Sequence, residues 1–191
     1  MSKSTAAQGA ALWQKQPKAN AELFALTYGA LVGELVRDYE TVQEIQQQLD
    51  TMGHSIGIRC IEELLAKQDS PTAGSPSFVE SADMVQMAFR MFLGVTAETA
   101  AVPDKPEAAY TVTFADNPLS LFVELPTEGP LADLEYSQLL CGLVRGVLEM
   151  LQFDVTAKMS SSTVAGHDTN IMLVELQQVL QQGAGDDYGE E

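Results

Sequence analysis

Apolar residues in the first half of the chain recur every three or four positions, which is the spacing of one face of an α-helix. Two such stripes cover residues 22–39 and 42–65. Leu23, Val32 and Val36 widen the first stripe, so we expect that helix to be covered on more than one side. Residues 81–93 are apolar nearly all round, which predicts a third helix in the core with Ser81 as its N-cap.

The second half of the chain changes to alternation with a period of two, which is typical of strands. The alternating segments are residues 110–114, 119–125, 153–159 and 170–176. Asp116, Asn117 and Pro118 form a turn signal between the first two, which predicts an antiparallel hairpin. A fourth helical stripe covers residues 136–151. Runs of helices and strands in this order predict an α+β fold with helices packed on an antiparallel sheet.

The ends of the chain lack these patterns. Residues 1–19 show little periodicity, and we expect a flexible tail from which Trp13 could dock on the domain. Pro71, Gly74 and Pro76 predict a loop over residues 68–77. Residues 183–191 read GAGDDYGEE and predict a flexible acidic tail. One domain is therefore expected over residues 20–182.

Composition and charge limit the partners. The 191 residues are 46% hydrophobic, enough for a single full core. The net charge of −17 disfavours nucleic acid, which needs clustered basic residues. Residues 106–191 hold 14 acidic and 2 basic residues, which favours either a solubilising face or a surface for a basic partner. No signal peptide or membrane span is expected, and the unpaired helical Cys60 and Cys141 are typical of a reducing compartment, so we expect a cytosolic protein.

One catalytic-looking string is present. Gly53-His54-Ser55-Ile56-Gly57 matches the nucleophile elbow of serine hydrolases, with His167 as the base that follows. That elbow requires a strand ending at the serine in a parallel sheet, whereas the residues before Ser55 are helical. We therefore expect a chance match and a protein that is not an enzyme, and no metal site is expected from two histidines and two separated cysteines.

Glycines recur at four-residue spacing within the predicted helices. Gly53 and Gly57 predict a bend or a close helix crossing in the second helix. Gly142 and Gly146 in the fourth predict either close helix approach or an internal channel for an apolar ligand. Arg145 and Glu149 are expected to pair with each other within that helix.

Several strings of the chain resemble one known family. They are ELFALTYGALVGELVRDYE (22–40), QLDTMGHSIGIRCIEELLA (48–66), ADMVQMAFRMFLGV (82–95), NPLSLFVELP (117–126) and YSQLLCGLVRGVLEMLQFDVTAK (136–158). On these strings the chain resembles the subunit-three branch of the small-subunit family of the TRAPP (transport protein particle) vesicle-tethering complex.

The resemblance implies an α/β plait of four main helices on a four-stranded antiparallel sheet. It implies a non-catalytic assembly subunit that acts in ER-to-Golgi transport and contributes to nucleotide exchange on a Rab-family GTPase. The implied partners are other small TRAPP subunits, in a homodimer or heterodimer, and the GTPase through the assembled complex. The implied location is cytoplasmic and peripheral at the cis-Golgi and endoplasmic reticulum, with membrane contact only through the complex.

The resemblance also implies a hydrophobic tunnel that holds an acyl chain on a cysteine. Residues 68–80 of this chain contain no cysteine, and Ser75 lies nearest the expected position. Ala88, Gly142 and Gly146 are the expected tunnel lining, and the tunnel is expected to hold at most a non-covalent fatty acid. Such a chain could also act as a fatty-acyl carrier by itself. Glu190 and Glu191 are the expected contacts with the GTPase.

Overall fold

The computed structural model describes residues 5–67 and 76–180. Its helices are α1 (Thr5–Lys15), α2 (Ala21–Asp38), α3 (Val42–Lys67), α4 (Phe78–Ala88) and α5 (Gln138–Met150), with a π-helical segment η1 (Phe89–Leu93) and 3₁₀ turns η2 (Pro118–Ser120) and η3 (Thr163–Ala165). Its strands are β1 (Glu98–Ala101), β2 (Ala109–Phe114), β3 (Phe153–Ser161) and β4 (Asn170–Val179). The strand order is β1-β2-β4-β3, and all neighbours are antiparallel. The predicted α+β class, with helices on a four-stranded antiparallel sheet, is confirmed.

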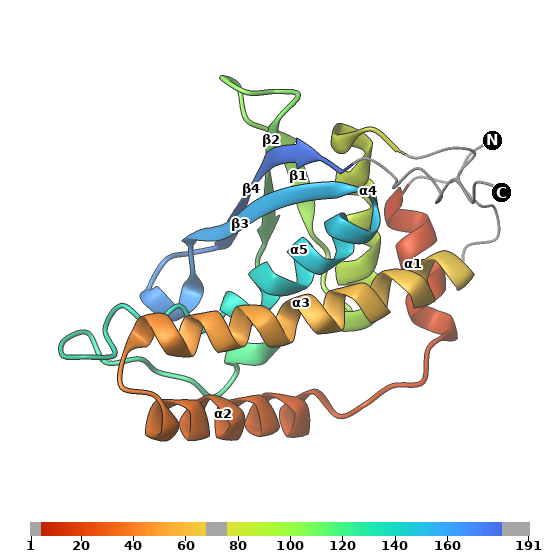
Figure 1. Cartoon of the computed structure of the whole chain (residues 1–191). Coiled ribbons are helices and arrows are strands. Elements are labelled where there is room, and N and C mark those ends of the chain that lie inside the picture. The colour runs from red at the N-terminus through yellow and green to blue at the C-terminus, as the bar shows by residue number, and fades with distance from the viewer. Residues whose placement is uncertain (1–4, 68–75, 181–191) are drawn as a thin grey trace, which may run out of the picture.

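The helices form successive layers beneath the sheet (Figure 1). α5 packs against β3, α3 packs along α5, and α2 lies outside α3 (Figure 1). α4 continues directly into η1, and α1 packs against both. α5 is central because nine of its thirteen residues are buried. In the described part of the chain, no helix is long and apolar enough to cross a membrane.

Four glycines let α3 and α5 touch backbone to backbone. A Cβ added to Gly53 or Gly57 on α3 would collide with the α5 backbone at Leu139 or Leu143. A Cβ added to Gly142 or Gly146 on α5 would likewise collide with the α3 backbone. Of the alternatives offered by the sequence, close helix approach therefore describes all four glycines.

Two charged contacts flank this crossing. Arg145 Nη2 lies 2.6 Å from Asp50 Oδ2, and His54 Nε2 lies 2.7 Å from Glu149 Oε2. The predicted pairing of Arg145 with Glu149 is therefore wrong. Each residue instead pairs across the interface, because the glycines bring the α3 side chains within reach of α5.

The structure differs from the sequence prediction at the N-terminus. Residues 5–15, expected as part of a flexible tail, form helix α1 and bury Leu12. Trp13 docks as predicted: its ring lies against Gly94, where an added Cβ would come within 2.8 Å of the ring, and the left-handed φ of 71° also favours glycine there. Lys18 Nζ also lies over the Trp13 ring, 3.5 Å from the ring centroid. Tertiary packing thus stabilises a helix whose own periodicity is weak.

Ser81 is not the N-cap of the third predicted helix. The N-cap of α4 is Ser77, four residues earlier. Ser77 and Glu80 form a capping box, in which Glu80 Oε2 accepts a hydrogen bond from Ser77 N at 2.8 Å. Ser81 is fully buried, and its hydroxyl donates to the Phe78 carbonyl at 2.6 Å. The Ser-x-x-Glu pattern of Ser77 and Glu80, which is typical of a helix start, precedes the apolar residues of α4.

The predicted hairpin of residues 110–114 and 119–125 is also wrong. β2 lies between β1 and β4, so both of its edges are already paired. Pro118 instead begins η2, and the Asn117 side chain accepts from Leu119 N at 3.1 Å. The fourth strand is β1, a short segment that the hydrophobic pattern did not reveal because it lies exposed at the edge of the sheet.

Candidate functional site

Helix α2 is held on the domain along one face. Ala25, Tyr28, Val32 and Leu35 are buried. The Tyr28 hydroxyl donates to the Tyr136 carbonyl at 2.6 Å, and the two rings meet edge to face at 4.9 Å. Burial raises the pKa of Tyr28 above its usual range, so the hydroxyl stays protonated as a donor. These contacts fix the rotation of α2 about its own axis.

The other face of α2 is apolar and exposed. We call its residues the α2 patch: Leu23, Phe24, Leu26 and Leu31, which are 65%, 47%, 57% and 36% exposed. η2 packs against α2, and the segment that follows it exposes two more large apolar residues, Leu121 and Phe122. The sequence predicted that α2 is covered on more than one side, whereas the residues that the structure describes cover one side.

Such an arrangement is typical of a protein–protein contact surface. An amphipathic helix at the surface normally turns charged and polar residues to solvent. Here, across the first three turns of α2, most exposed side chains are apolar; Glu22 is the one exposed charged residue there, and the other charged residues lie in the last turns. Exposed apolar groups that cluster in this way mark interaction sites.

The residues expected to line a tunnel lie in two different places. Ala88 ends α4 and is 3% exposed, within a segment that also buries Met84 and Met87. Gly142 and Gly146 lie against the backbone of α3. Ser75, Glu190 and Glu191 lie outside the described residues.

The serine of the elbow-like string has no elbow geometry. Ser55 is exposed in the interior of α3, which runs unbroken from Val42 to Lys67. His54, the residue before Ser55, pairs with Glu149, and His167 lies exposed after η3. The strand and strained turn that would expose a nucleophilic serine are therefore replaced by continuous helix.

Neither cysteine is paired, and both are deprotonated with difficulty. Burial raises the pKa of Cys60 to about 11, with a smaller contribution from Glu63. Burial also raises the pKa of the Cys141 thiol, which lies inside α5. Because the thiolate is the nucleophile, neither residue has the character of a reactive cysteine.

Comparison with known proteins identifies the family. The family described as Transport protein particle (TRAPP) component matches residues 24–175. The chain belongs to the TRAPP family. It is 41% identical over 181 residues to trafficking protein particle complex subunit 3 of Dictyostelium discoideum, covering 94% of this chain and 95% of that one. It is 39% identical over 175 residues to transport protein particle subunit bet3 of Schizosaccharomyces pombe, covering 91% and 93%.

A solved structure agrees with this membership. The TRAPP complex subunit 3 from Naegleria fowleri, crystallised covalently bound to palmitic acid, superposes with a TM-score of 0.77 at 36% identity, covering 85% of this chain and 98% of that one. The phenol-responsive sensory domain of PoxR superposes with a TM-score of 0.60 at 16% identity and shares the fold alone. The family resemblance stated from the sequence is confirmed.

Proposed function

We propose that this TRAPP-family chain is an assembly subunit of a vesicle-tethering complex and that it pairs with another small subunit, or with a second copy of itself, through the α2 patch. The observation that carries this proposal is the exposed apolar face of a helix whose opposite face is anchored on the domain. Burying these leucine and phenylalanine side chains would stabilise a complex by the hydrophobic effect.

In this proposal the chain supplies surfaces, and the activity belongs to the assembly. We infer that the assembled complex acts in ER-to-Golgi transport and promotes nucleotide exchange on a Rab-family GTPase, with the chain peripheral at the cis-Golgi and endoplasmic reticulum. The membership of the family and the names of its relatives support this assignment. Glu190 and Glu191 remain the proposed contacts with the GTPase.

The double substitution Leu23→Glu and Leu26→Glu tests the pairing. Both side chains are more than half exposed, so the change places charge on the α2 patch and leaves the core intact. We expect loss of co-purification with other TRAPP subunits, and loss of any homodimer in light scattering.

A matched control is Leu65→Glu, which adds charge at a leucine that is 44% exposed on α3, outside the α2 patch. It should leave assembly unchanged, and urea unfolding should show both proteins folded. Normal assembly of the double variant would refute α2 as the pairing surface.

A second candidate function, that of a fatty-acyl carrier, is favoured by the Naegleria relative that holds palmitic acid. We propose that this chain binds a fatty acid without a covalent bond, since residues 68–80 contain no cysteine and Cys60 and Cys141 are poor nucleophiles. Each buried methylene contributes about 0.8 kcal/mol, which is enough to hold a long chain.

Native and denaturing mass spectrometry separate the alternatives. A non-covalent fatty acid adds its mass only under native conditions, whereas an acyl thioester adds mass under both. Ala88→Leu, which enlarges a buried side chain on α4, should abolish the native adduct. An adduct that survives denaturation would refute the proposal.

A further inference from the structure

The sheet has a free edge at β3. β3 pairs with β4 on one side only and ends the sheet, and among the described residues no strand pairs with its other side (Figure 1). Residues 155–159 pair with β4 without interruption between two irregularities, one at Asp154/Val155 and one at Met159/Ser161. An edge strand presents backbone N–H and C=O groups that an added strand can pair with.

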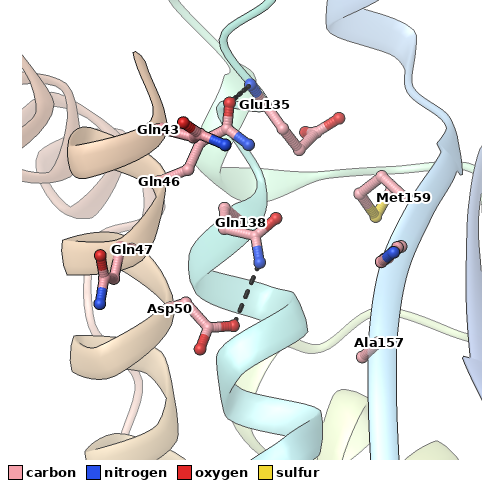
Figure 2. A pocket seen from close by; sticks show the side chains of 9 residues that line it. Gln43, Gln46, Gln47, Asp50, Glu135, Gln138, Ala157 and Met159 are labelled. Carbon is pink, nitrogen blue, oxygen red and sulfur yellow. Dashed lines mark hydrogen bonds between the residues drawn. The ribbon is translucent and has the colours of Figure 1, made fainter. Parts of the chain in front are cut away.

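A pocket of about 440 Å³ opens beside this edge. Figure 2 shows Gln43, Gln46, Gln47 and Asp50 of α3 on one side of it, Glu135 and Gln138 near the start of α5, and β3 opposite. Ala157, Lys158 and Met159 supply the β3 wall, so the pocket and the free edge share the same three residues.

The two carboxylates of the pocket are in different electrostatic states. The charge of Asp50 is offset by the Arg145 guanidinium at 2.6 Å, and its other oxygen accepts a hydrogen bond from the Gln138 amide at 3.1 Å. Glu135 accepts one backbone hydrogen bond, from Ser137 N at 2.8 Å, and among the described residues no cation pairs with it. Lys158, on the opposite wall, forms no ion pair with it either within the described chain.

The partly buried environment of Glu135 destabilises its carboxylate when no cation pairs with it. Its side chain is half-buried, and desolvation raises the pKa of its carboxyl despite opposing hydrogen bonds from the Ser137 backbone and the Ser137 hydroxyl. A half-buried carboxylate gains more from a cationic partner than an exposed one does, because water screens the charge less.

We propose that β3 and this pocket bind an extended segment of a partner protein as a fifth strand, with one Lys or Arg side chain of that segment placed against the Glu135 carboxylate. Backbone hydrogen bonds to residues 155–158 supply affinity, and the pocket selects the side chain. Lys158 restricts the cation to the Glu135 side of the pocket. This site is independent of the α2 patch, so the chain would hold two partners at once.

Selection from a phage library of random heptapeptides, against the purified full chain, tests the proposal. We expect enriched peptides to carry Lys or Arg at one fixed position. Synthetic copies should protect from hydrogen exchange those amides of residues 155–158 that face away from β4. Glu135→Gln should weaken their binding at least about tenfold by removing the partner of a desolvated cation. Glu128→Gln, the same charge change at an exposed residue of the preceding loop, should leave binding unchanged.

Backbone methylation separates strand addition from side-chain binding alone. N-methyl groups on alternate residues of the enriched peptide should abolish binding, and N-methyl groups on the intervening residues should not, because only every second amide of an added strand faces its neighbour. Binding should persist in the Leu23→Glu, Leu26→Glu variant. Failure to enrich peptides, equal binding to Glu135→Gln, or protection confined to other residues would overturn the proposal.

Discussion

Replacing Gly146 by alanine tests the contact between α3 and α5. The new Cβ would lie 3.0 Å from the carbonyl carbon of His54 and closer still to its oxygen. Carbon atoms pack best at about 3.5–4.0 Å and the oxygen is nearer than the carbon, so the helices must separate by roughly 1 Å or more. The obstacle is backbone, which cannot rotate aside as a flexible side chain can.

The expected cost is several times the gain from helix propensity. Overpacking of a tight core costs about 1–3 kcal/mol and occasionally more, and here separation also weakens the Arg145–Asp50 and His54–Glu149 contacts. Alanine returns about 1 kcal/mol as a better helix former than glycine. The upper end of that range applies because the obstacle is backbone, so after the propensity gain we expect Gly146→Ala to lower the free energy of unfolding by about 2 kcal/mol.

Urea unfolding followed by circular dichroism measures this change, and α2 provides a matched control. Gly33 also lies within a helix, but a Cβ there meets no atom within 4 Å. Gly33→Ala should therefore raise stability by about 0.5–1 kcal/mol through propensity alone. If Gly146→Ala is as stable as Gly33→Ala, the backbone contact between the helices does not exist as described.

Three further predictions each concern a single residue. Ser77→Ala removes the α4 capping box and should lower the free energy of unfolding by about 1 kcal/mol in urea titration, while Ser81→Ala should leave the start of the helix intact. Because burial raises the pKa of Glu135 above 4.5 in the folded state, its stabilising contribution is present below that pH and is lost as the pH rises through the folded pKa. Glu135→Gln should therefore unfold at higher urea than the native chain at pH 7 and at the same urea at pH 4. With the pKa of Cys60 at about 11, roughly 0.1% of that thiol is ionised at pH 8, so iodoacetamide should label it far more slowly than a free thiol, as followed by mass spectrometry.

Most helices and strands could be predicted because their burial follows a simple period. α2, α3 and α5 each bury a continuous stripe, and β2 and β3 alternate between buried and half-buried positions. β1 could not be predicted, because an exposed strand of Glu-Thr-Ala-Ala carries no alternation to recognise. Residues 119–125 alternate without forming a strand, because β2 had no free edge left to pair with them.

The candidate sites show a similar division. The width of the α2 stripe predicted a second covered face of that helix, and among the described residues that face is exposed instead. Glu135 could not be identified from the sequence, since its pocket forms where α3, the start of α5 and β3 meet. Local spacing likewise favoured an Arg145–Glu149 pair, and only the tertiary contact of α3 with α5 shows the partner to be Asp50.

The two proposed surfaces share one physical requirement, which is a backbone that does not rearrange on binding. Association is weakened by every group that must be ordered at the interface. The α2 patch avoids this cost because the Tyr28–Tyr136 contact already fixes the helix that carries it. The β3 edge avoids it because α5 supports the strand from below and is itself held against α3 at four glycines. The close helix crossing thus holds in place the helix beneath the β3 edge, so a partner strand added there would meet a surface that is already ordered.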